Sequence, residues 1–251
     1  MARKTFNSEP RGFFRSGLAL WRTMHDRIGG DVEEAAIVQF AFNRSKWGKK
    51  VARWDLLAAE VAENSPEAAQ LMAQRASVGV IDLQELIKLP VGTLGHTYAK
   101  VSLDRGIEPV ALEPISQEED GDWLMTWAYE THDIWHVMTG NYYDEVGEFG
   151  VAGFYLGQMP RFTFVLFFSS LMMLRTVWRD RDEMESRMQA FVDGYERGSR
   201  AKNLMGLNWT ESFHRDLEEL RAEWGIEDAG RIQGSENQAA FRPEFRVGAL
   251  R

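Results

Sequence analysis

Two histidines and an aspartate near the middle of the chain have a spacing that suits metal binding. His132 and His136 are four residues apart, and Asp133 lies between them. On an α-helix the second histidine would be rotated by only about 40° from the first and would lie one turn further along. Asp133 would lie on the same flank of that turn. The pattern therefore predicts that two imidazoles and a carboxylate face one cation.

A fourth ligand has to come from another helix, and Glu148 is the candidate. Glu148 follows His136 by twelve residues, which would place it about 18 Å further along a straight helix. The chain between them contains the helix-stop sequence Thr139-Gly140-Asn141, and Asp144 is suited to cap a second helix. If the second helix is antiparallel, it returns Glu148 to the metal. The predicted ligands are thus His132, Asp133, His136 and Glu148.

The predicted ligand set favours one class of metal ion. Two imidazoles and two carboxylates form a borderline-hard set that suits Zn²⁺ and is acceptable to iron or manganese. Mg²⁺ would prefer oxygen ligands alone. We expect zinc, with Fe, Mn or Mg as alternatives. The sequence contains no cysteine, so thiolate zinc sites, iron–sulfur clusters, disulfides and cysteine nucleophiles are excluded.

A simpler interpretation is that these residues bind no metal. In that case His132 and His136 would be partly buried polar residues on a helix flank, paired with Asp133 and Glu130. Asp133 itself is either a metal ligand, which we favour, or the catalytic residue that moves a proton. A metal phosphohydrolase of the histidine–aspartate type is disfavoured, because such a site needs further ligands and no convincing motif surrounds the remaining histidines, His25, His96 and His214.

The elements that must position these residues are predicted to be helices. Apolar residues recur with helical spacing along nearly the whole chain, and no sustained alternation or Val/Ile-rich run indicates strands. We predict an all-α fold, a single-domain multi-helix bundle. The expected helices lie within residues 32–57, at 67–74 after the cap Ser65, in a short stretch after Asp82, from a Ser116/Glu119 capping box to Gly140, at 144–160, and from Thr210 to Gly225.

The chain of 251 residues contains no repeat and no Pro/Gly/Ser-rich linker, so we predict one folded domain. Residues 1–30 would be a basic N-terminal segment or first helix, residues 31–227 the all-α domain, and residues 228–251 a poorly ordered tail.

The net charge of −9 and the pI near 5.2 argue against nucleic acid as a partner. The longest uncharged run, residues 162–174, is too short to span a bilayer, and no secretory signal is evident. We therefore expect an intracellular protein.

Apolar and glycine-rich stretches have both a structural and a functional interpretation. The runs Phe162–Phe168 and Leu171–Leu174 would form a core helix that is apolar all round, or the wall of a channel for a lipid tail. A stripe of glycines at helical spacing would allow close helix packing, or would leave a groove for such a tail. This stripe consists of Gly147, Gly150, Gly153 and Gly157.

The metal pattern is similar to a known signature. H-D-x-x-H followed by eleven residues and E, here from His132 to Glu148, resembles the signature of the coenzyme Q (ubiquinone) biosynthesis protein four family. The upstream segment from Ile81 to Gly95 resembles that family's D-L-x-x-L…L-P-x-G-(S/T)-L-G segment, and Trp209–Ile226 resembles its last helix. The resemblance covers about residues 74–226. Residues 141–145 and 152–154 depart from the family pattern.

The resemblance implies an enzyme of ubiquinone biosynthesis. Its activity would be that of a metal-dependent oxidative decarboxylase, a lyase that replaces the ring carboxylate of a polyprenylated hydroxybenzoate by a hydroxyl. A cation beside the ring would act as a Lewis acid, but Zn²⁺ cannot carry electrons, so oxygen would react with the ring directly or a redox metal would replace zinc. The prenyl tail would need an apolar, isoprenoid-binding surface. Arg200 and Lys202 would face the substrate carboxylate or be solvated.

The same resemblance implies partners and a location. Expected partners are the polyprenylated aromatic substrate, other quinone-biosynthesis enzymes and a membrane surface, with a homodimer as a further option. The protein would be cytoplasmic and peripheral on the inner face of the membrane, or on the mitochondrial matrix side if its source is eukaryotic. The alternative function is a non-catalytic, lipid-binding scaffold that organises the quinone-biosynthesis complex and holds a structural metal.

Overall fold

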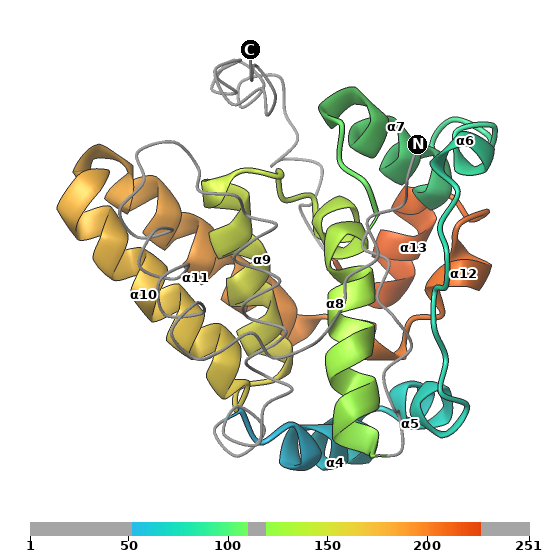
Figure 1. Ribbon diagram of the computed structural model, residues 1–251, viewed down its shortest axis with the longest axis horizontal. Coiled ribbons are helices and arrows are strands. Elements are labelled where there is room, and N and C mark those ends of the chain that lie inside the picture. The colour runs from blue at the N-terminus through green and yellow to red at the C-terminus, as the bar shows by residue number, and fades with distance from the viewer. Residues whose placement is uncertain (1–51, 110–118, 227–251) are drawn as a thin grey trace, which may run out of the picture.

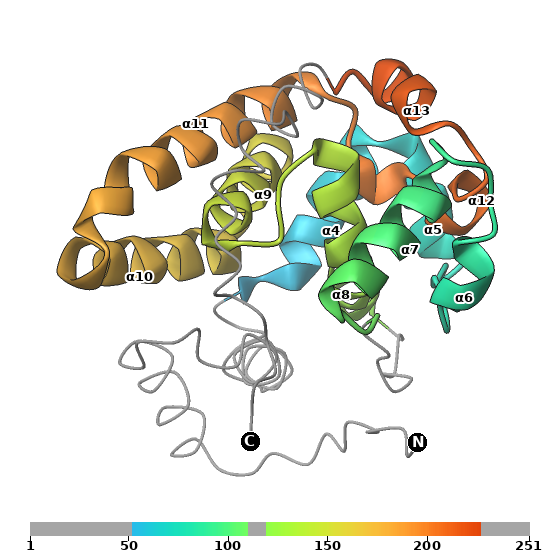
Figure 2. The same ribbon diagram turned by 90° about the horizontal axis from the view of Figure 1, so that it is seen from above.

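The computed structural model describes residues 52–109 and 119–226, and within these ranges the chain forms helices and no β-strand (Figures 1 and 2). The helices are α4 (Trp54–Asn64), α5 (Pro66–Ala73), α6 (Leu83–Leu86), α7 (Leu94–Arg105), α8 (Asp120–Thr139), α9 (Glu145–Gln158), α10 (Thr163–Arg179), α11 (Met184–Arg200), α12 (Trp209–Ser212) and α13 (Leu217–Trp224), with the short 3-10 helices η1 (Arg181–Glu183) and η2 (Leu204–Gly206). The predicted all-α fold is confirmed. The predictions for residues 1–30, for the tail 228–251 and for Ser116 fall outside the described residues.

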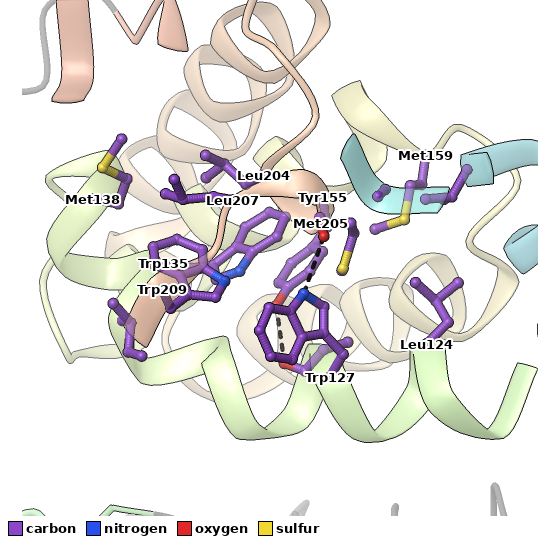
Figure 3. Close-up of a cluster of buried hydrophobic side chains, with 14 of the residues drawn as sticks. Leu124, Trp127, Trp135, Met138, Tyr155, Met159, Leu204, Met205, Leu207 and Trp209 are labelled. Carbon is purple, nitrogen blue, oxygen red and sulfur yellow. Dashed lines mark hydrogen bonds between the residues drawn. The ribbon is translucent and has the colours of Figure 1, made fainter. Parts of the chain in front are cut away.

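Helix α8 occupies the centre of the described fold. In Figure 1, helices α9, α10 and α11 lie on one side of α8, α7 and α13 lie on the other, and α4 and α5 lie near its first turns. Figure 3 shows Nε1 of the buried Trp127 donating to the carbonyl oxygen of Met205 in η2, at 3.1 Å. Trp135, about two turns further along α8, stacks on Tyr155 of α9 with ring centroids 4.1 Å apart. The tryptophans thus hold α8 against both η2 and α9.

Side-chain caps begin several helices where the sequence predicts them. Ser65 caps α5, Asp82 caps α6 and Asp144 caps α9, in each case through an oxygen that accepts backbone N–H groups of the first turn. Gly140 ends α8 in the left-handed conformation, with φ of 72°. Gly225 ends α13 in the same way. The ends of these helices therefore follow from local chemistry.

The prediction of one continuous last helix from Thr210 to Gly225 is wrong. The chain forms two helices there, because Asn208 caps α12 and Asp216 caps α13. An antiparallel bridge joins Thr93 to Asp216 and interrupts the helix. This contact with a segment far away in the sequence overrides the local helical periodicity. The predicted apolar stripe is nonetheless buried, and it comprises Phe213, Leu217, Leu220 and Trp224.

Helices α9 and α11 pack with their backbones in direct contact. Gly150 faces Gly194 and Phe154 faces Gly198, so contacts advance together along both helices, and the two helices are parallel. A Cβ added to Gly198 would lie 2.9 Å from the Cα of Phe154, which is closer than two such carbons can approach. Close helix packing therefore explains Gly153 and Gly157 of the glycine stripe, whereas Gly147 and Gly150 lie against Tyr142 and Asn141 of the reversal that follows α8.

Replacing one of these glycines should destabilise the fold. We expect Gly198→Ala to lower the free energy of unfolding by about 1–3 kcal/mol or more, because the added methyl group meets backbone rather than a flexible side chain. Urea unfolding followed by circular dichroism measures the change. Glu196→Ala, at an exposed position of the same helix, should shift the stability by less than about 0.5 kcal/mol. Equal unfolding midpoints for the two variants would contradict this packing.

Helix α10 lies at the edge of the described fold, next to α11 (Figure 2). Its buried residues are Ser169, Arg175 and Thr176, whereas Phe167 is 60% exposed and Trp178 is 66% exposed. The interpretation of this stretch as a core helix that is covered on all sides is therefore wrong. Apolar composition identified the helix, but only neighbouring elements decide which of its faces are covered. Among the described helices, none combines the length and the hydropathy needed to cross a membrane.

Candidate metal centre

Three side chains from α8 and α9 converge on one point. The Nε2 atoms of His132 and His136 lie 3.4 Å apart. One carboxylate oxygen of Glu148 lies 3.3 Å from Nε2 of His132, and the other lies 3.2 Å from Nε2 of His136. Within the described part of the chain these residues form a group whose ligand atoms all lie within 4.8 Å of one another. The chain reversal between α8 and α9 thus returns Glu148 to the histidines, as predicted.

The spacing of these atoms suits a single small cation. Zinc holds imidazole nitrogens and carboxylate oxygens at about 2.0–2.1 Å, so two of its ligand atoms are separated by about 3.3–3.4 Å. The separations measured here lie between 3.2 and 3.4 Å, and Glu148 directs a different oxygen toward each histidine. Two imidazoles and one carboxylate are also the donors of a familiar class of catalytic zinc site, in which the fourth position is left for water or substrate. The residues present therefore fit a metal ion.

His136 is held in the orientation that a metal ligand needs. Its side chain is buried, and its Nδ1–H donates to the carbonyl oxygen of Tyr142 at 2.9 Å. Because a carbonyl can only accept, this hydrogen bond places the proton on Nδ1 and leaves a lone pair on Nε2 for the metal. The ring also stacks on Tyr143, with centroids 4.5 Å apart. Both tyrosines belong to the reversal between α8 and α9.

His132 and Glu148 are half-buried and electrostatically coupled. Their side chains are 35% and 40% exposed. Burial by itself lowers the pKa of His132, but the hydrogen bond and the charge of Glu148 raise this pKa above its ordinary value. Burial raises the pKa of Glu148, but the two histidines bring it well below its ordinary value. Glu148 is therefore ionised at physiological pH, as a metal ligand must be.

Asp133 lies beside the centre without joining the three converging ligands. Burial raises the pKa of its carboxyl group above the ordinary value, although the imidazoles of His132 and His136 act to lower it. The negative charge of ionised Asp133 therefore interacts with the imidazoles of both histidines. The roles predicted for Asp133, as fourth ligand or as catalytic residue, stay predictions.

Comparison with known proteins agrees with the resemblance found in the sequence. The family model described as coenzyme Q (ubiquinone) biosynthesis protein Coq4 matches residues 57–230, well over half of the chain. This chain belongs to the Coq4 family. The matched range includes both helices that carry His132, His136 and Glu148.

Several relatives of this Coq4 family member come from fungi and insects. The chain is 27% identical over 169 residues to the mitochondrial ubiquinone biosynthesis protein COQ4 of Podospora anserina, covering 65% of this chain and 54% of the relative. It is 31% identical over 159 residues to the mitochondrial COQ4 homolog of Anopheles gambiae, covering 61% and 54%. The chain thus spans about half the length of these relatives.

A solved structure has the same fold. The crystal structure of a protein from Nostoc punctiforme PCC 73102 superposes with a TM-score of 0.68, covering 86% of this chain and 98% of the other. The two sequences are 24% identical. At this identity the likeness establishes the fold alone.

Three tyrosines beside the Coq4 centre were not predicted from the sequence. Tyr98 comes from α7, Tyr143 from the reversal and Tyr155 from α9. Burial raises the pKa of each phenol, and the charge of Asp133 raises it further. The phenols therefore stay protonated. Tyr155 lies seven residues, or two helical turns, after Glu148, so helical spacing could have identified it, whereas no sequence signal links Tyr98 to the centre.

A basic side chain that the sequence did not point to lies beside Tyr143. Arg200 and Lys202 are exposed, and Nζ of Lys202 lies 5.8 Å from the ring centroid of Trp224. These positions favour the interpretation of both as solvated residues. Arg105 of α7 instead lies over the ring of Tyr143, 5.4 Å from its centroid. The guanidinium of Arg105 thus places a positive charge next to Tyr143, whose ring stacks on His136.

Proposed function

We propose that this protein is an enzyme of ubiquinone biosynthesis that binds one metal ion and catalyses the oxidative decarboxylation of a polyprenylated hydroxybenzoate. The observation that carries the proposal is the convergence of His132, His136 and Glu148 in a member of the Coq4 family. The names of the fungal and insect relatives support the pathway. The reaction itself is proposed from the family resemblance and from the chemistry of the ligand set.

The proposed reaction breaks the bond between the ring and its carboxylate, releases carbon dioxide and puts a hydroxyl group in its place. Replacing carboxylate by hydroxyl removes two electrons from the substrate, so dioxygen or another two-electron oxidant must take them up. A bound Zn²⁺ or similar cation would supply Lewis-acid stabilisation of negative charge on the ring and its carboxylate. Because Zn²⁺ cannot accept electrons, the oxidant would have to meet the ring itself.

The chain's own residues would divide the remaining tasks. His132, His136 and Glu148 would hold the ion, and the partial exposure of His132 and Glu148 leaves a side of the centre open to substrate. An open side favours a catalytic over a closed, structural metal site. Asp133 would accept or deliver a proton. The rings of Tyr143 and Tyr155, which stack on His136 and His132 respectively, would limit access of water.

Metal affinity should depend on pH. The histidines must be neutral to bind a cation, so we expect the affinity to fall as the pH drops below about 6. Glu148 raises the pKa of His132 in the metal-free protein, so competition by protons should begin at a higher pH than it would for an isolated imidazole. Competition with a chromogenic chelator at pH 7.5 and pH 5.5 measures the change, after correction for the chelator's own protonation. An affinity that is the same at both pH values would contradict binding by these imidazoles.

A second candidate function is a lipid-binding scaffold that organises other quinone-biosynthesis enzymes around a structural metal. The exposed apolar side chains of α10, such as Phe167 and Trp178, favour contact with a lipid or a partner. In either function we propose a peripheral position at a membrane surface, on the mitochondrial matrix side if the source is eukaryotic. The activity of the Asp133→Asn variant separates the enzyme from the scaffold.

A further inference from the structure

Two buried arginines bind the carbonyl groups at the end of α8. The last turn of a helix has carbonyl oxygens without partners in the helix. Arg221 of α13 donates from Nη2 to Val137 at 2.6 Å and from Nε to Met138 at 3.1 Å. Arg197 of α11 donates from Nη1 to Thr139 at 2.7 Å. Two other helices thus bring positive charge to the negative end of the helix that carries His132 and His136.

Of these two arginines, Arg197 also contacts the reversal that follows α8. Its Nη2 donates to Oδ1 of Asn141 at 3.4 Å, and Nδ2 of Asn141 donates to Oγ1 of Thr139 at 2.8 Å. Asn141 is buried. On its other side Asn141 packs against the bare face of α9, because a Cβ added to Gly150 would lie 2.8 Å from its Cγ. Asn141 therefore lies between α9 and Arg197 and contacts both.

The residue after Asn141 supplies the hydrogen bond that orients a metal ligand. The carbonyl oxygen of Tyr142 accepts the Nδ1–H of His136 at 2.9 Å. This carbonyl also lies against α9, where a Cβ added to Gly147 would lie 2.6 Å from the Tyr142 carbonyl carbon. A displacement of Asn141 would move the adjoining peptide and with it the acceptor for His136.

We propose that Arg197 is a positioning residue of the metal centre. By binding Thr139 and Asn141 together, it sets the carbonyl of Tyr142 and thereby the tautomer and direction of the His136 ring. The effect on metal affinity rests on the proposed function. The effect on the tautomer does not, because the hydrogen bond from His136 to Tyr142 exists in the protein without a metal.

Two variants, one at Arg197 and one at Asn141, test whether the contact between these residues orients His136. A third variant serves as a matched control. Arg197→Lys keeps the positive charge but cannot bond both acceptors in the fork geometry of a guanidinium. Asn141→Ala removes the acceptor in the reversal and keeps the bond between Arg197 and Thr139. Arg221→Lys alters the other buried arginine, which caps the same helix end through Val137 and Met138.

The first measurement is ¹⁵N–¹H NMR of the histidine side chains in metal-free protein. We expect a protected Nδ1–H signal of His136 in the wild type and in Arg221→Lys, and its loss in Arg197→Lys and Asn141→Ala. The second measurement is Zn²⁺ affinity by chelator competition. We expect a loss of about 10- to 100-fold in Arg197→Lys and Asn141→Ala, the range typical of residues that orient a metal ligand, and near-wild-type affinity in Arg221→Lys.

An unchanged Nδ1–H signal in both test variants would overturn the proposal, as would an equal loss of affinity in Arg197→Lys and Arg221→Lys. If Arg197→Lys does not fold, Asn141→Ala decides the question, because it leaves both arginine caps in place. If the wild type binds no Zn²⁺, the proposed function fails, and the NMR comparison still tests the positioning role.

Discussion

Purified His136→Ala protein should contain less than about a tenth of an equivalent of metal, against about one equivalent in the wild type. Removing one of three converging ligands leaves two donors, which are too few to compete with water for a divalent cation. Glu148→Ala should have the same effect, because its carboxylate lies 3.2–3.3 Å from both Nε2 atoms. Elemental analysis of protein purified without added chelator measures the content.

A histidine outside the centre provides the matched control for this prediction. His214 is exposed, so His214→Ala should retain the metal content of the wild type. Circular dichroism of each variant should confirm that the fold is retained. A full equivalent of metal in His136→Ala would show that the ion is held elsewhere. A wild type that binds no metal under any condition would make the three residues a hydrogen-bonded polar cluster.

Turnover in Asp133→Asn should fall by about 10²–10⁴-fold, the usual contribution of a positioned acid or base. The amide keeps the size of the side chain but loses its charge and its ability to exchange a proton at pH 7. Decarboxylation of a polyprenylated hydroxybenzoate by purified protein, followed by mass spectrometry of the hydroxylated product and by release of carbon dioxide, measures the change. Cells that carry the variant should accumulate the carboxylated intermediate.

The metal content of the same variant separates the two roles of Asp133. If Asp133→Asn retains its metal, the residue acts on the proton, and if the metal is lost, the residue is a ligand. Glu130→Gln is the control on the same helix, since that carboxylate accepts hydrogen bonds from Ser77 and Val78 instead of facing the histidines. Its turnover should stay within about twofold of the wild type. Normal quinone levels in cells that carry Asp133→Asn would favour the scaffold over the enzyme.

The parts of the centre that depend on local chemistry could be predicted from the sequence. Helical periodicity places His132 and His136 on one flank of a turn, because four residues nearly complete one turn of any α-helix. Gly140 and Asp144 stop one helix and start the next through interactions within a few residues of themselves. The direction of the reversal followed from the need to bring Glu148 back, and the geometry agrees.

Other features depended on which surfaces meet in the folded chain, and these the sequence could not decide. The last helix is split because Asp216 pairs with Thr93, a contact that helical periodicity does not contain. The apolar composition of α10 predicted a helix but not its exposure. Arg197, which binds the end of α8 and the reversal, belongs to a helix distant in the sequence, and so does Tyr98 beside Asp133. The spacing of residues along the sequence determines which of them share one face of a helix. Which residues meet across the core depends on how all the helices pack together.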